Sequence, residues 1–286
     1  MTAVQQGTIV KTVRRRRGLR KETGYWAVGV AVALLLLAPI VLALIRSFQG
    51  PAGPDGTPFT LQNYARLSHA GSSVWSYAAN SLMVAVATAV IVVVLSTLAG
   101  FALARVRFRG SGVVFLLLLV PFMAPFQGIL TPLFLVLSAM HLNDSLVGLV
   151  LVYATFQLPF ATFLMRNSFA QIPLAIEEAA LLDGASTRQL LLRVMLPFAV
   201  PGAITASIYA FLFGWNEFLA ALTLLVTDSK YTLPIALSNL QSGAYGQVDF
   251  GLLDAGAVVA MVPCIVVFLV LQRFYVGGLA AGAVKM

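Results

Sequence analysis

The segment between residues 173 and 197 holds the residues best suited to recognition by another protein. It contains Glu178-Ala179-Ala180, then Gly184 after three further residues, and Leu196-Pro197 after eleven more. Long apolar stretches flank it on both sides. An acidic residue beside two small alanines lets a partner surface approach closely, which is docking chemistry and not catalysis. A solvated loop without a partner is the alternative, but such loops are usually shorter.

Local signals predict a helix–turn–helix hairpin in this segment. Pro173 suits the first turn of a helix, and Gly184 suits the left-handed residue that ends one. Ser186 and Gln189 have the spacing of a capping box, so a second helix should begin near Thr187 and end where Pro197 blocks it. The predicted docking residues are Glu177, Glu178, Ala179, Ala180, Asp183, Gly184, Leu196 and Pro197.

The chain lacks the sequence features of a nucleotide site or a metal site. A phosphate-binding P-loop ends in Gly-Lys followed by Ser or Thr, and no Gly-Lys pair occurs here. The two histidines, His69 and His141, are isolated, so we expect no metal centre. We therefore expect no cofactor in this chain and no enzymatic activity of its own.

Polar and aromatic residues inside apolar stretches are candidates for a solute pathway. Glu217 is a charge within a predicted span; it could line a substrate cavity or be hydrogen-bonded to hold helices together. Tyr209, Phe213 and Asn216 fall on one helical stripe, which could face the pathway or simply pack. The full set of pathway candidates is Asn80, Tyr153, Gln157, Tyr209, Phe213, Asn216 and Glu217.

The elements that position these residues are transmembrane helices. Hydrophobic residues make up 60% of the chain and charged residues 10%, against about 25% charged in soluble globules. The apolar runs are continuous, which excludes a transmembrane β-barrel and predicts an all-α integral membrane protein. Six spans are predicted, near 24–46, 75–104, 112–137, 145–168, 198–226 and 251–274. Pro121, Pro125 and Pro132 should kink the third span within a helix bundle.

The basic residues predict the orientation of these spans. With six spans, 15 of the 18 lysines and arginines fall on the side of the hairpin and both termini, and only Arg46, Arg66 and Lys230 fall on the other. The positive-inside rule then places the hairpin and both ends in the cytoplasm. The net charge of +8 is explained by this arrangement and by anionic lipid, so we expect no binding of nucleic acid.

Three stretches of the chain resemble one family of membrane proteins. The order E-A-A-x-x-x-G, nine residues, V-x-L-P from Glu178 to Pro197 resembles the EAA loop of bacterial ABC importer permeases, with Val194 in place of Ile. Trp215-Asn216-Glu217-Phe218 resembles the WNEF pattern of maltose-type carbohydrate permeases, and residues 272–285 resemble the QR…GLTAGAVKG ending of that subgroup. The resemblance covers the chain from about residue 24 and is closest to the second-permease type.

The resemblance implies an organisation and a set of partners. It implies a basic tail over 1–23, a six-span permease domain over 24–276 with a coupling loop at about 170–197, and a tail over 277–286. The implied partners in the bacterial inner membrane are a homologous permease, two ATP-binding subunits that hold ATP and Mg, an extracytoplasmic substrate-binding protein and a sugar. The alternatives are a permease for a polyol or glycerol phosphate, and a proton-coupled secondary transporter.

Overall fold

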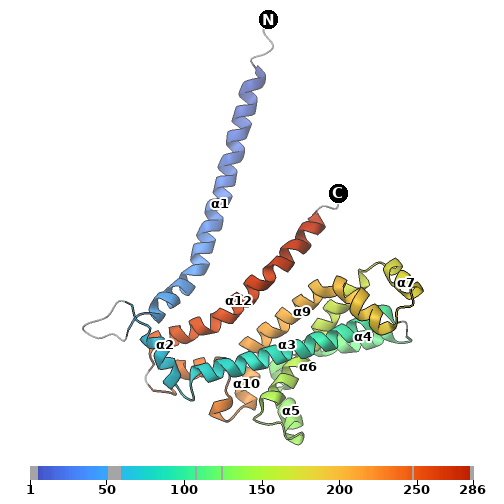
Figure 1. The fold of residues 1–286 in the computed structure, drawn as a ribbon. Helices are drawn as coiled ribbons and strands as arrows, with labels where there is room; N and C mark the ends of the chain where they lie inside the picture. The colour runs from blue at the N-terminus through green and yellow to red at the C-terminus, as the bar shows by residue number, and fades with distance from the viewer. Residues whose placement is uncertain (1–5, 51–58, 107, 124, 247, 284–286) are drawn as a thin grey trace.

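The computed structural model describes residues 6–50, 59–106, 108–123, 125–246 and 248–283, and the regular structure of these residues is entirely helical (Figure 1). The long helices are α1 Gln6–Ser47, α3 Val74–Arg105, α6 Leu146–Ala170, α9 Leu196–Asn216 and α12 Phe250–Ala283. The short helices are α2 Gln62–Arg66, α4 Ser111–Leu119, α5 Phe126–Ala139, α7 Leu174–Leu182, α8 Thr187–Gln189, α10 Leu219–Leu224 and α11 Leu233–Ser242. Single 3₁₀ turns lie at Leu67–His69, Val120–Met123 and Asp228–Lys230, and a π-helical segment at Leu190–Met195. The predicted all-α fold is confirmed.

Helices α3, α6 and α9 pack side by side and form the body of the molecule (Figure 1). Small residues let their backbones approach closely, as in other membrane bundles. A Cβ atom added to Gly100 of α3 would lie 2.6 Å from the Cβ of Met165 on α6. One added to Gly214 of α9 would lie 3.1 Å from the Cα of Ala85 on α3. The glycines are therefore required by the contact between helices.

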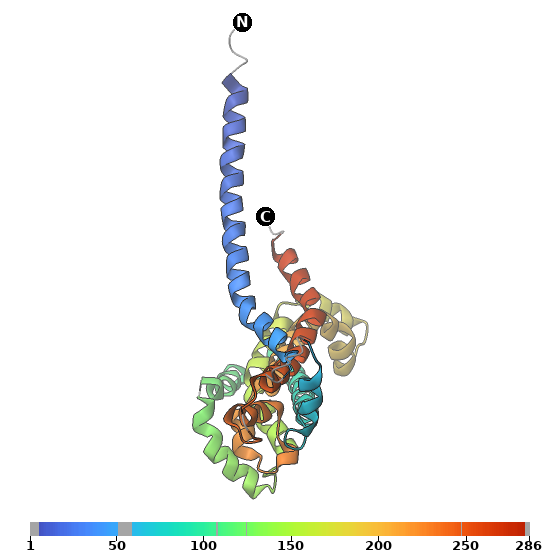
Figure 2. The same cartoon turned by 90° about the vertical axis from the view of Figure 1, so that its left-hand side faces the viewer.

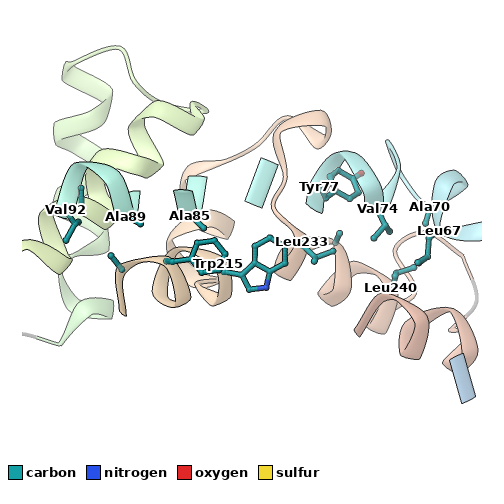
Figure 3. Packing of buried hydrophobic residues seen from close by; sticks show 14 of the residues in the cluster. Leu67, Ala70, Val74, Tyr77, Ala85, Ala89, Val92, Trp215, Leu233 and Leu240 are labelled. Atoms are coloured by element: carbon teal, nitrogen blue, oxygen red, sulfur yellow. The ribbon is translucent and has the colours of Figure 1, made fainter. Parts of the chain in front are cut away.

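One of three clusters of buried side chains extends from α3 and α9 to α11 (Figure 3). Trp215 near the end of α9 is only 3% exposed, and its indole Nε1 donates a hydrogen bond to the Ala260 carbonyl of α12 at 3.0 Å. Leu233 and Leu240 of α11 belong to the same cluster. This core joins α11 and α12 to the body at the end away from α7.

Helix α1 and the C-terminal part of α12 extend away from the body (Figures 1 and 2). The apolar part of α1, Val28–Ser47, has a mean hydropathy of 3.0, and Ser47 at its end is its one buried residue. Over Phe250–Val270 of α12, 11% is buried, against 56% for α6. Such large apolar surfaces must be covered by lipid or by another membrane helix.

Among the described residues, five helices are long and apolar enough to cross a membrane, and they correspond to five of the six predicted spans. The third predicted span, 112–137, is divided into α4, a 3₁₀ turn and α5. Pro121 and Pro125 lie at the division, because each lacks the N–H that a continuous helix would use. The predicted kink is confirmed, while the total of six spans stays a prediction.

Both ends of the chain are more helical than the sequence analysis expected. Helix α1 begins at Gln6, inside the predicted tail 1–23, where lysine and arginine are good helix formers. Helix α12 continues to Ala283, so most of the predicted tail 277–286 is helical and only 284–286 lie outside the described residues.

Candidate functional site

The predicted hairpin is present between α6 and α9. Helix α7 ends before Gly184, which has a φ of +80° and takes the left-handed conformation expected of it. Ser186 begins the next helix with a complete capping box: its N–H donates to Gln189 Oε1 at 2.8 Å, and the Gln189 N–H donates to Ser186 Oγ at 3.4 Å. Both features had been predicted from local sequence alone. Pro173 occupies the N-cap position of α7, without a capping hydrogen bond from its side chain, and is not part of the first turn.

The second helix of the hairpin does not end at Pro197, and this part of the prediction is wrong. Helix α8 passes through the π-helical segment Leu190–Met195 directly into α9, in which Pro197 occupies the first turn. The N–H of Leu196 bonds to the carbonyl of Leu191, five residues back. The wider turn shifts the hydrogen-bond register just before the proline, so its missing N–H does not interrupt the helix. Leu196 and Pro197 therefore join the hairpin rigidly to α9.

The two adjacent glutamates of the hairpin face in different directions. Glu177 forms an ion pair with Arg105 of α3, Oε2 to Nη1 at 3.4 Å, and Arg105 is only 6% exposed. Arg105 Nη2 also donates to the carbonyls of Phe169 at 2.6 Å and Ile172 at 2.5 Å. Glu178 is exposed on α7. Glu177 therefore anchors the hairpin to the body, which the sequence analysis had not distinguished from docking.

The outer surface of the hairpin combines acidic and apolar side chains. Ala179, Asp183 and Gly184 are exposed beside Glu178, while Ala180 is partly buried against the body. Leu182 is 88% exposed and Leu181 is 51% exposed. Exposed leucines next to carboxylates form a surface suited to a protein partner and unsuited to hydrocarbon.

The aromatic stripe of α9 is brought together with a second stripe on α6. The rings of Tyr209 and Phe160 lie 4.5 Å apart, and Phe213 lies 5.5 Å from Tyr153 and 6.2 Å from Phe156. Tyr153 is fully buried. Gln157, another predicted pathway residue, is 2% exposed. These contacts pack α6 against α9, while Tyr209 stays 41% exposed. The assignment of these residues to a solute pathway stays a prediction.

Glu217 lies in a break between two helices, which corrects the prediction of one continuous fifth span over 198–226. Helix α9 ends at Asn216 and α10 begins at Leu219. The Glu217 carboxylate accepts a hydrogen bond from Tyr153 Oη at 2.6 Å and from the N–H groups of Ala220 at 3.0 Å and Ala221 at 3.3 Å. A carboxylate that caps the start of α10 stabilises a break which apolar patterning cannot reveal.

The two asparagines among the pathway candidates have separate environments. Asn80 of α3 is half-buried and donates to the carbonyls of Ser229 at 2.9 Å and Tyr231 at 3.0 Å, so it holds the chain between α10 and α11. Asn216 is exposed and donates to Leu212 of its own helix at 2.8 Å. Asn216 also borders a cavity.

That cavity lies between the end of α9, α11 and α12 and has a volume of about 400 Å³. Its lining includes Trp215, Asn216 and Phe218 from the helix break, and Ser238 and Gln241 from α11. The sequence analysis assigned no function to 233–242. The sequence pattern that could have predicted a site there is a helix that starts after Thr232 with a proline in its first turn and carries polar residues three positions apart.

A second polar cluster lies at the end of the body away from the hairpin. Asp144 accepts hydrogen bonds from the N–H groups of Val226 at 2.9 Å and Thr227 at 3.0 Å, and Lys230 Nζ lies 2.7 Å from it. Partial burial raises the pKa of the Asp144 carboxyl, but Lys230 and these donors outweigh burial, so its pKa lies well below the usual range. The cluster ties the α5–α6 connection to the segment before α11.

Comparisons with known proteins match most of this chain. The family model described as "Binding-protein-dependent transport system inner membrane component" matches residues 96–279, which include the hairpin and the helix break. The trehalose transport system permease protein SugB of Mycobacterium tuberculosis (strain CDC 1551 / Oshkosh) is 36% identical over 277 residues, covering 94% of this chain and 99% of the relative.

A second relative and one solved structure extend the comparison. The arabinooligosaccharides transport system permease protein AraQ of Bacillus subtilis (strain 168) is 31% identical over 264 residues, covering 89% of this chain and 92% of the relative. A chain from the crystal structure of a bacterial ABC transporter involved in the import of the acidic polysaccharide alginate has a TM-score of 0.75 and 25% identity, covering 91% of this chain and 98% of that chain.

Proposed function

The chain belongs to the family of binding-protein-dependent transport system inner membrane components, and from this premise we propose that it forms half of the translocation pathway of an ATP-driven sugar importer. Its relatives include permeases named for trehalose and for arabinooligosaccharides. These names favour a sugar or oligosaccharide over a polyol or glycerol phosphate.

The proposed complex contains four further proteins. A homologous permease completes the pathway and covers the exposed apolar surface of α1 and α12 together with lipid. Two ATP-binding subunits hold ATP and Mg, and a substrate-binding protein delivers sugar from outside the cell. The orientation follows the distribution of basic residues, so a thiol reagent that cannot cross the membrane should label a cysteine at Gly243 in intact cells and leave one at Ser186 unlabelled.

The observation that carries the proposal is that some hairpin residues face outward while another binds the body. Glu178 and Leu182 are exposed and available to an ATP-binding subunit, whereas Glu177 is tied to Arg105. Arg105 also binds the carbonyls at the end of α6, so a push on α7 reaches α3 and α6 together. Closure of the ATP-bound subunits would then favour one of two arrangements of the body, as coupling requires.

The experiment that tests the proposal reverses the outer charge of the hairpin. Glu178→Lys adds repulsion as well as removing attraction at a docking surface, so the ATP-binding subunit should co-purify poorly and sugar-stimulated ATPase activity should fall. Ser242→Lys, at an exposed position on α11 far along the chain, is the matched control. Normal co-purification and ATPase activity in Glu178→Lys would show that the hairpin is not the coupling element.

A further inference from the structure

The cavity at the helix break has a lining that differs from its neighbours. Its ten lining residues are all uncharged and include Asn216, Ser238 and Gln241. By contrast, a cavity between α3, α9 and α12 that includes Trp75 and Val262 is lined almost wholly by apolar atoms, which suits lipid tails. A smaller cavity of about 320 Å³ beside the hairpin, with Ser168 and Gln171 among apolar residues, is uncharged as well. The cavity at the break is larger and has two aromatic side chains, Trp215 and Phe218, in its lining.

The polar side chains of this cavity have unused hydrogen-bonding capacity. Pro234, Leu237, Ser238 and Gln241 recur at i, i+3, i+4 and i+7, so one face of α11 borders the cavity. Within the described part of the chain, the side chains of Ser238 and Gln241 make no hydrogen bond. Asn216 uses one N–H for Leu212, and its amide oxygen and second N–H remain for a ligand.

The walls of the cavity are fixed before any ligand arrives. Trp215 is held by its bond to Ala260 and is stacked on Phe211 at 6.2 Å between ring centroids. The first turn of α11 is anchored because the Leu233 N–H donates to Ser81 Oγ of α3 at 2.8 Å. Glu217 fixes the break that places Phe218 at the cavity. Rigid walls lower the entropic cost of binding.

We propose that this cavity is a contact site for a neutral saccharide within this subunit's half of the pathway. Sugars present apolar faces and hydroxyl edges, which match aromatic walls and neutral amide and hydroxyl groups. A phosphate or carboxylate ligand would call for cationic side chains, and the lining has none. A volume of about 400 Å³ lies within the range of about 300–1,000 Å³ that small-molecule sites have. The inference rests on the proposed function as a sugar permease.

The first experiment measures sugar imported per ATP hydrolysed by the whole complex in proteoliposomes, with saturating binding protein loaded from a labelled panel of neutral mono- to tetrasaccharides. Gln241→Ala and Ser238→Ala should each lower this ratio about 2- to 10-fold, the factor expected from losing one neutral hydrogen bond. Ser242→Ala, on the same helix but outside the lining, should keep the wild-type ratio. A defect of folding alone would lower uptake and hydrolysis together and leave the ratio unchanged.

The second experiment asks whether sugar occupies the cavity. Cys264 is the single cysteine of the chain, so Cys264→Ser provides a background for Ser238→Cys and for the control Ser242→Cys. Sugar-loaded binding protein with ATP should slow thiol labelling at position 238 at least about threefold relative to position 242, because a bound saccharide excludes the reagent.

The outcomes separate the site from the function. The saccharide site would be overturned if both alanine variants kept the wild-type ratio of sugar to ATP and if sugar slowed labelling equally at positions 238 and 242. Sugar import by the complex would stand. Uptake of a uronic acid dimer, with no uptake of any neutral sugar, would overturn the neutral-saccharide site alone. Uptake of glycerol 3-phosphate, with no uptake of any saccharide, would overturn both.

Discussion

The two sides of α9 are joined to their neighbours by different interactions. Toward α3 and α6, Gly214 lies against the backbone of Ala85 and Phe213 enters an aromatic cluster, so the helices are closely packed at these residues. Toward α11 and α12, a cavity of about 400 Å³ remains. The side that carries the aromatic stripe is held by helix packing, and the side with the cavity is formed by a helix break.

The attachment of α11 also differs from that of α6. Packing of small and aromatic side chains holds α6 against its neighbours. Polar contacts of Asp228, called the rim contacts below, hold the segment that leads into α11 and the one that follows it. Asp228, before α11, accepts hydrogen bonds from Tyr77 Oη at 2.8 Å and Tyr245 Oη at 3.3 Å. Asp228 also accepts from the Ser72 N–H at 3.0 Å. These contacts hold the segment before α11 against the start of α3.

The largest effect on stability is expected from a bulky side chain on the face of α9 that packs against α3 and α6. Gly214→Leu would force side-chain atoms into the backbone of Ala85 and should destabilise the protein by about 1–3 kcal/mol. Thermal melting in detergent measures it. Gly112→Leu in α4 is the control, because no atom lies within 4 Å of the added Cβ. Equal melting temperatures for the two variants would contradict close packing on this side.

An effect of similar size is expected from the break between α9 and α10. Glu217→Leu leaves the N–H groups of Ala220 and Ala221 and the hydroxyl of Tyr153 without their acceptor, at a cost of about 1–3 kcal/mol. Glu217→Gln keeps one acceptor oxygen and should lose about half as much or less. Thermal melting and uptake together test this.

The same pair of variants distinguishes hydrogen bonding from proton transfer. Uptake should survive in Glu217→Gln far better than in Glu217→Leu. Equal and complete loss in both would instead favour a charge-dependent role for Glu217 and return the proton-coupled transporter to consideration.

The smallest effect on stability is expected from a change of pH that protonates Asp228 in the rim contacts. Partial burial raises the pKa of the Asp228 carboxyl, but hydrogen bonds from Ser72, Tyr77 and Tyr245 outweigh it, so its pKa in the folded protein lies below the ordinary value. The unfolded chain therefore binds the proton more readily, and the stabilisation is present above about pH 4 and lost as pH falls through the folded pKa. The melting temperature should drop modestly on acidification from about pH 6 to about pH 3.

A variant isolates this contribution. Asp228→Asn should flatten the acid side of the pH profile, whereas Asp183→Asn on the exposed hairpin should leave its slope as in the wild type. Identical slopes for Asp228→Asn and the wild type would show that the rim contacts do not contribute to folding.

Local sequence by itself determined the hairpin and the membrane character of the chain. Gly184 needs a left-handed conformation, Ser186 and Gln189 satisfy each other over three residues, and prolines lack a donor wherever they stand. These are properties of short segments, so spacing reveals them. The apolar runs likewise follow from composition, because a membrane span needs about 20 apolar residues in succession.

Only the tertiary structure decided which surfaces the side chains face. The aromatic residues of α9 pack because a matching stripe on α6 meets them, and Glu177 turns inward because Arg105, 72 residues earlier in the chain, lies beside it. Glu217 ends a helix because Tyr153 and the start of α10 supply donors to its carboxylate. Each of these outcomes depends on the free energy of contacts between segments far apart in the chain. The spacing of neighbouring residues does not reveal such contacts.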